Sequence, residues 1–154
     1  SAVAISPPLI AQCFHCFLGC LGFAILFNIH GPGGLLCALG GVLTWATYMI
    51  VISLGGSDLL GYLWATIVAS FYAEVMARVR KYPAISYLLI SIFPLIPGAS
   101  VYYTMPHAVK GDMASFADTG IHTIGIAGAI AVGILLVSTA FRIWTVQMRN
   151  HKKA

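Results

Sequence analysis

Five long apolar segments constrain this chain more than any other feature of its sequence. They span about 9–28, 35–54, 59–79, 84–103 and 121–144. Each is near the roughly 20 residues that an α-helix needs to cross about 30 Å of hydrocarbon. Only 8% of the 154 residues are charged, against about 25% in a typical soluble domain. The sequence therefore predicts an all-α integral membrane protein with one domain, residues 1–154, and five transmembrane helices.

The connections between these segments are short and contain residues that end helices. HGPGG separates the first two segments, and GGSD precedes the third, where Ser57 or Asp58 is a suitable N-cap. The stretch 104–119 is too polar to span a membrane. Its apolar residues repeat at helical spacing, which indicates a short interfacial helix. Pro106 and Gly111 weaken that helix, so a plain loop is an equally good alternative. No basic residue precedes the first apolar segment, so no cleaved signal peptide is expected.

The basic residues indicate an orientation in the membrane. Those between the third and fourth segments are Arg78, Arg80 and Lys81. Those around the C-terminal end are Arg142, Arg149, Lys152 and Lys153. With five spans, both groups fall on one side, and only Lys110 falls on the other. Because cytoplasmic loops carry an excess of Lys and Arg, we expect the N-terminus outside and the C-terminus inside, in a multi-pass cytoplasmic membrane protein.

The fourth segment contains a sequence that a membrane helix does not ordinarily carry, IFPLIPGASVYY at 92–103. Pro94, Pro97 and Gly98 fall within five residues. Each proline removes a backbone donor and clashes with the preceding turn, and unpaired backbone groups are costly in lipid. One proline would fit a simple kink, which is the alternative. Two prolines and a glycine favour a discontinuous helix that faces a cavity.

The geometry of such a break predicts its ligand chemistry. The second half-helix would begin near Gly98, Ala99 and Ser100. Its free N–H groups and positive dipole end suit an anion such as a carboxylate. Tyr102 and Tyr103 add hydroxyl donors nearby. The candidate substrate-binding residues are therefore Pro94, Pro97, Gly98, Ala99, Ser100, Tyr102 and Tyr103.

Two ionisable residues inside or at the ends of the apolar segments are candidates for ion coupling. Glu74 lies about one turn from the end of the third segment, with Arg78 four residues later. The pair fits a surface ion pair and a coupling carboxylate about equally. His122 begins the fifth segment, where an interfacial histidine is favoured over a proton relay.

Two further patterns are interpreted as helix packing. Gly125, Ala129 and Gly133 form a small-residue ladder that allows close helix approach. Cys13, Cys16 and Cys20 share a helical face, but His15 projects off that face, so packing is favoured over a metal site. No metal, cofactor or disulfide is expected. No acid/base pair stands at usable spacing, so an enzyme is not expected either.

The PLIPG element in the fourth of five segments is followed by a serine and tyrosines. Together with FAILFN at the end of the first segment and RVRKYP before the fourth, it resembles the threonine/serine exporter (ThrE) family. The likeness is to the small membrane subunits (the YjjB type) that match the C-terminal half of fused exporters. The resemblance implies proton-driven export of threonine, serine or a dicarboxylate such as succinate. It also implies a larger subunit of the same family, or a second copy, as partner.

The odd number of spans agrees with that resemblance. Two five-span halves in tandem would be inverted relative to each other, as in many secondary transporters. A C-terminal half would then begin outside and end inside, as the basic residues predict. The alternative function is a non-transporting scaffold assembled through the Gly125, Ala129 and Gly133 face. Membrane lipid is a partner in either case, and nucleic acid in neither.

Overall fold

The computed structural model describes residues 7–29, 31–96 and 98–153, with side chains described except at 7–9 and 98–101. Within these ranges the chain is helical and contains no strand, which confirms the all-α prediction. The elements are α1 (Pro7–Leu26), α2 (Pro32–Ser53), α3 (Asp58–Arg80), α4 (Ala84–Ile92), the 3-10 turn η1 (Phe93–Leu95), α5 (Gly98–Val109) and α6 (Met113–His151).

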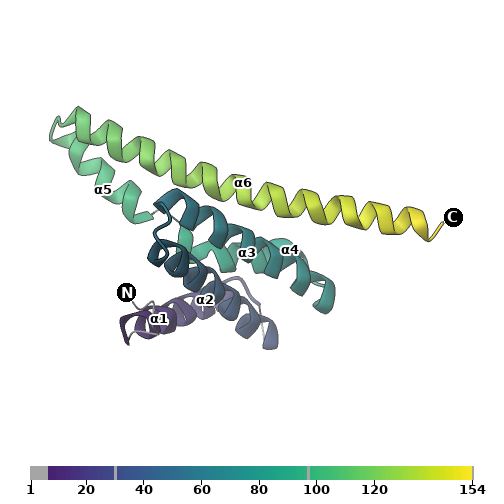
Figure 1. Ribbon diagram of the computed structural model, residues 1–154. Coiled ribbons are helices and arrows are strands. Elements are labelled where there is room, and N and C mark those ends of the chain that lie inside the picture. The colour runs from purple at the N-terminus through teal and green to yellow at the C-terminus, as the bar shows by residue number, and fades with distance from the viewer. Residues whose placement is uncertain (1–6, 30, 97, 154) are drawn as a thin grey trace.

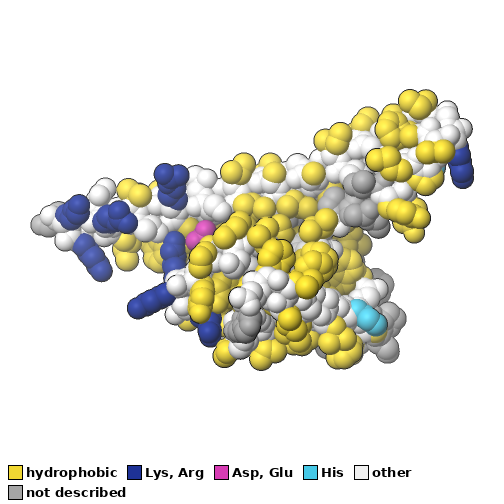
Figure 2. All heavy atoms as spheres, turned by 180° about the vertical axis from the view of Figure 1, so that it is seen from behind, with side chains coloured by type: hydrophobic (Ala, Val, Ile, Leu, Met, Phe, Trp, Pro, Cys, Tyr) yellow, Lys and Arg dark blue, Asp and Glu magenta, His cyan; other side chains and the backbone are white. Residues whose placement is uncertain are grey.

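Among the described residues, three helices are long and apolar enough to cross a membrane, namely α2, α3 and α6. Shorter apolar helical stretches cover Ile10–Leu26 and Ala84–Leu95. Large apolar side chains are exposed along the helices, and hydrophobic side chains cover much of the face in Figure 2. A surface of this kind is suited to lipid, because soluble monomers rarely expose large apolar patches. Crossing by all five predicted segments stays a prediction.

The helices α1 to α4 pack into a bundle, and α6 lies along α3 (Figure 1). The core cluster consists mainly of small side chains: Cys20, Ala24, Cys37, Ala38, Ala73, Tyr87 and Ile90. Small residues allow helix backbones to approach closely, which drives association where lipid removes the hydrophobic contrast. Contacts of α3 with α6 advance in step along both helices, from Leu59 with Gly125 to Thr66 with Gly133. The two helices therefore run parallel.

The segment 104–119 differs from its prediction as a separate interfacial element. Its first part belongs to α5, which ends at Val109, and its last part belongs to α6, which begins at Met113. Gly111 has a φ of 76° and so allows the tight turn between them, and Asp112 accepts a hydrogen bond from Ser115 N at 3.2 Å. A left-handed glycine and an N-cap restart the helix at once. The fifth predicted span is accordingly part of a longer helix.

The α6 helix has 39 residues, which gives a length of about 58 Å. Hydrocarbon is only about 30 Å thick, so part of α6 must extend beyond it or tilt strongly. Near its start α6 packs against α5, and the two form a hairpin at one end of the molecule (Figure 1). The Lys and Arg side chains gather toward the opposite end, where α6 terminates (Figure 2), while Lys110 lies in the turn of the hairpin. The predicted grouping of the basic residues at one end is present in the fold.

Candidate functional site

The helix interruption expected in the fourth segment is present. Regular α-helix ends at Ile92, Pro94 lies in the η1 turn, and Ile96 is extended with φ −61° and ψ 121°. Helix resumes at Gly98, and Pro97 lies outside the described residues. The cause is local, because Pro94 has no N–H to donate and a residue before proline is driven out of helical geometry. The chain therefore offers two helix ends facing a break.

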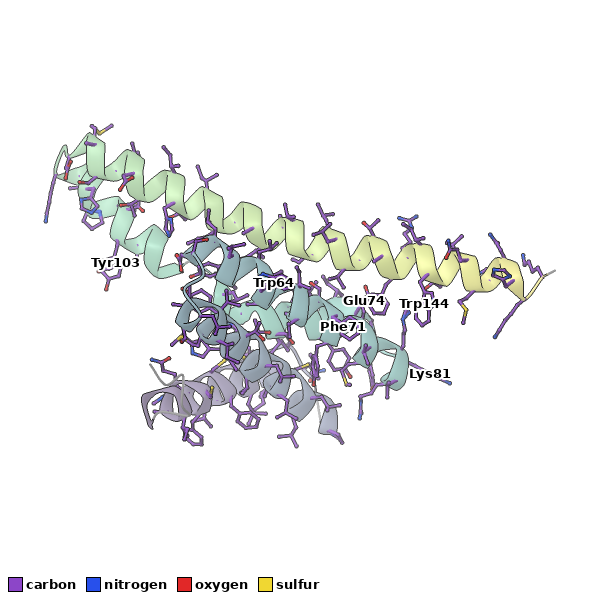
Figure 3. The ribbon with its side chains drawn as sticks, viewed as in Figure 1. Trp64, Phe71, Glu74, Lys81, Tyr103 and Trp144 are labelled. Atoms are coloured by element: carbon purple, nitrogen blue, oxygen red, sulfur yellow. The ribbon has the colours of Figure 1, made fainter. Side chains whose placement is uncertain are left out.

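The predicted ligand groups around this break are only partly described. The backbone of Gly98, Ala99 and Ser100 forms the first turn of α5, while their side-chain surroundings lie outside the described part. Tyr102 and Tyr103 are 70% and 64% exposed. In Figure 3, Tyr103 points away from α6. The two tyrosines thus face outward from this chain.

Buried hydroxyl groups lie on the bundle side of the interruption. In the described part of the chain, Ser91 Oγ and Ser70 Oγ are buried without a hydrogen-bond partner. Ser91 is on α4, five residues before the extended Ile96. A Cβ atom on Gly40 of α2 would collide with Ser91 Oγ and would lie 2.7 Å from Cε1 of Tyr72. The lack of a side chain at Gly40 therefore lets α2, α3 and α4 meet at a polar interior position.

Glu74 lies where α3 meets the C-terminal half of α6 (Figure 3). Its Oε2 is 3.8 Å from Arg78 Nη2, and the same nitrogen donates to Thr145 Oγ1 at 3.0 Å. The Arg78 guanidinium carbon also lies 4.8 Å from the Phe141 ring centre and 5.6 Å from the Trp144 ring centre. Arg78 therefore ties Glu74 to α6, a role that spacing along α3 did not reveal.

His122 lies at the other end of the α3–α6 pair. Its Nε2 is 2.8 Å from Asp58 Oδ2, and Tyr48 donates its hydroxyl to Asp58 Oδ1. Ser57 is the N-cap of α3 and accepts from Leu60 N, which resolves the two capping candidates in favour of Ser57. Asp58 instead joins α2, α3 and α6. Because Asp58 and Glu74 are sixteen positions apart on one helix, about 24 Å along α3 separates Glu74 from the contact point of His122.

The small-residue ladder of α6 faces α3 of the same chain. A Cβ atom on Gly133 would lie 2.9 Å from Thr66 Cβ and 3.3 Å from Leu63 O. A Cβ atom on Gly125 would lie 3.2 Å from Leu59 Cδ2. Ala129, between these glycines, is half-buried. This face therefore packs within the chain.

Two of the cysteines, Cys20 and Cys37, belong to the packed interior, and Cys13 and Cys16 are half-buried. Cys20 and Cys37 are fully buried, and Cys20 Sγ lies 3.5 Å from Ile90 O. All four cysteines are free. His15 is exposed and bonds to Ala11 O at 2.6 Å. Among the described residues, no group of three or more His, Cys, Asp or Glu side chains is placed to hold a metal ion.

Comparison with known proteins gives one result of direct use. A family model described as Threonine/Serine exporter, ThrE, matches residues 12–140. The matched region contains α2 to α5 completely, and with them the interruption between η1 and α5. No solved structure matches the chain.

Proposed function

The chain belongs to the ThrE family of threonine/serine exporters, and we propose that it forms one half of a secondary transporter for a small amino or carboxylic acid. The observation that carries this proposal is the interrupted helix, in which Ile96 is extended and helix resumes at Gly98. In secondary transporters, broken helices of this kind hold the substrate near the middle of the membrane. The transporter exports this acid from the cytoplasm across the cytoplasmic membrane.

The substrate carboxylate binds at the start of α5. The first N–H groups of a helix have no partner within the helix, and its dipole places partial positive charge there. The backbone from Gly98 to Ser100 occupies that position. Small side chains at Gly98 and Ala99 permit close approach of the ligand, and Ser100 adds a hydroxyl donor. Pro94 and Pro97 keep the two half-helices apart.

A second chain completes the pathway. Tyr102 and Tyr103 are exposed on this chain, so they contact substrate or partner only from the outer side of α5. The partner is a larger subunit of the same family or a second copy. An inverted five-span half would place its own broken helix opposite this one. The N-terminus lies outside and the basic end, where α3 meets α4, lies in the cytoplasm.

Proton coupling involves a carboxylate in the α3–α6 interface. Glu74 is the coupling residue of this proposal, because its side chain is only 21% exposed and its partner Arg78 is also held by α6. A change in the charge of Glu74 would alter how α3 sits on α6. His122 and Asp58 are the second candidates, at the outer end of the same pair.

A non-transporting scaffold is less well supported. That alternative relied on the Gly125, Ala129 and Gly133 face for assembly, and Gly125 and Gly133 of this face contact α3 within the chain. Reconstitution distinguishes the two functions. Proteoliposomes with this chain and its larger partner should take up labelled threonine, serine or succinate in exchange for unlabelled substrate. Transport of none of the three by the complex would contradict the proposal.

A further inference from the structure

A cavity of about 300 Å³ lies at the basic end of the bundle, away from the interrupted helix. It is formed where α1 and α3 end and where α2 and α4 begin. Polar groups on its wall come from Asn28, Arg80, Tyr82, Ser86 and Tyr87. Cys37 and Tyr87, which belong to the core cluster, form its inner wall. The cavity thus reaches from the bundle end into the interior.

Arg80 is the residue of this wall that requires explanation. Its Nε is buried and has no hydrogen-bond partner in the described part of the chain. The nearby acid Glu74 is paired with Arg78 instead. The Tyr87 hydroxyl is hydrogen-bonded to the Arg80 guanidinium, but a neutral phenol does not neutralise the charge of the arginine. The half-buried guanidinium thus has no carboxylate partner in the described part of the chain, and this favours an anion beside it.

The chemistry of the wall favours a carboxylate. Guanidinium groups bind planar oxyanions through two parallel hydrogen bonds. Ser86 supplies a hydroxyl. No side chain caps the start of α4 at this wall, and although Ser86 N–H donates to Pro83 O at 3.2 Å, the N–H groups of Ala84 and Ile85 precede any intrahelical acceptor. Lys81 adds positive charge at the same end of the helix bundle, and this charge attracts anions from solution.

The position of the cavity favours a small free anion over the phosphate of a lipid. Its volume is at the lower end of the range for small-molecule sites. Its inner wall, formed by Cys37 and Tyr87, is buried within the helix bundle rather than on the apolar outer face. A lipid headgroup would be held at the outer face, where the acyl chains can remain in the bilayer.

We propose that this cavity is a second carboxylate site, in which Arg80 binds the substrate on the cytoplasmic side before it reaches the start of α5. The direction of this sequence of events depends on the proposed export function. Binding itself does not, because it requires only the cavity and Arg80. An exporter loads from the cytoplasm, and the cavity lies at the end where the basic residues gather.

Equilibrium binding to the purified full chain tests the site directly. The chain is placed in nanodiscs of zwitterionic lipid, and binding of labelled threonine, serine and succinate is measured. Arg80→Gln should weaken binding of the ligand by about tenfold to a hundredfold, as expected for loss of a charge-assisted hydrogen bond. The affinity of Arg80→Lys should fall between those of the wild type and Arg80→Gln, since an ammonium group lacks the planar geometry of a guanidinium. Lys81→Gln removes the same charge one residue away and should change binding less than about twofold.

Three results would overturn the proposal. The first is absence of carboxylate binding by the wild-type chain, and the second is unchanged binding in Arg80→Gln. The third is Arg80-dependent retention of an anionic lipid, seen by native mass spectrometry, in place of carboxylate binding. Size-exclusion chromatography establishes that each variant is folded. If Arg80→Gln does not fold, the binding measurement is made on Arg80→Lys instead. Arg80-dependent binding without any transport by the complete complex would contradict the export function alone.

Discussion

His122 Nε2 lies 2.8 Å from Asp58 Oδ2, and this contact joins α6, nine residues after its first residue, to the start of α3. Tyr48 donates to the other oxygen of the same carboxylate, so α2 is joined at that point as well. The consecutive helices α2 and α3 and the distant α6 are thereby joined at one point by a single side chain. Asp58 is therefore expected to matter for stability more than its position at a helix start suggests.

Replacement of Asp58 by alanine should lower the stability of the protein. It removes the acceptor of two side-chain hydrogen bonds, and the partly exposed setting limits the loss to about 1 kcal/mol. The measurement is the melting temperature of the purified chain in detergent. Asp118→Ala removes an exposed carboxylate of α6 and should leave the melting temperature unchanged. Equal melting temperatures for the two variants would refute the joining role of Asp58.

Gly40→Ala should separate α2 from α3 and α4. The added Cβ would collide with Ser91 Oγ and the Tyr72 ring, and overpacking of this kind costs about 1–3 kcal/mol. Gly128→Ala is the matched control, because a Cβ there meets nothing within 4 Å and alanine favours helix by about 1 kcal/mol. Thermal unfolding of both variants should therefore move in opposite directions. A stabilised Gly40→Ala variant would show that the helices do not approach as described.

The turn between α5 and α6 should depend on pH through Asp112. Hydrogen bonds from the Ser115 side chain and backbone N–H, with His107 nearby, lower the pKa of the Asp112 carboxyl below its ordinary value. A lowered folded pKa means that the stabilisation is complete above the unfolded pKa of about 4 and is lost as the pH falls through the folded pKa. Asp112→Ala should reduce the hydrogen-exchange protection of Ser115 N–H at neutral pH. The difference from wild type should shrink in acid, and a difference independent of pH would contradict this account.

Glu74→Gln should separate substrate exchange from proton coupling. The amide keeps the shape of the side chain and removes its titration, so exchange of labelled for unlabelled substrate should continue. The acceleration of uptake by an imposed pH gradient should be lost. Asp118→Asn, an exposed acid on α6, is the control and should respond to the gradient as wild type does. A Glu74→Gln variant that still responds would leave Glu74 only as the partner of Arg78.

The features that sequence predicted best are those determined locally. The interruption at Pro94 and Gly98 and the cap at Ser57 depend on the backbone chemistry of a few neighbouring residues. The segment 104–119 is largely helical, but it is not a separate element, because Gly111 and Asp112 end α5 and restart the chain as α6 directly. The role of Gly125 and Gly133 as packing residues was anticipated, but their partner α3 was not.

The contacts that sequence did not reveal join residues far apart in the chain. His122 and Asp58 are 64 positions apart, and Arg78 and Thr145 are 67 apart. These pairs exist because α3 and α6 run parallel, and no local pattern specifies that pairing. The Arg80 cavity is formed by the ends of four helices, so its wall can be recognised only once the helices are assembled.

The central claim is that the start of α5 binds the substrate carboxylate, and substrate counterflow by the Gly98→Leu complex tests it most directly. Proteoliposomes contain this chain with the proposed larger subunit and are loaded with unlabelled substrate before labelled threonine, serine or succinate is added outside. Gly128→Leu is the control, because a side chain there enters open space. The account predicts that Gly98→Leu lowers counterflow by about tenfold or more, equivalent to losing about 1.4 kcal/mol of binding, while Gly128→Leu retains it. Full counterflow by a folded Gly98→Leu complex would contradict the claim.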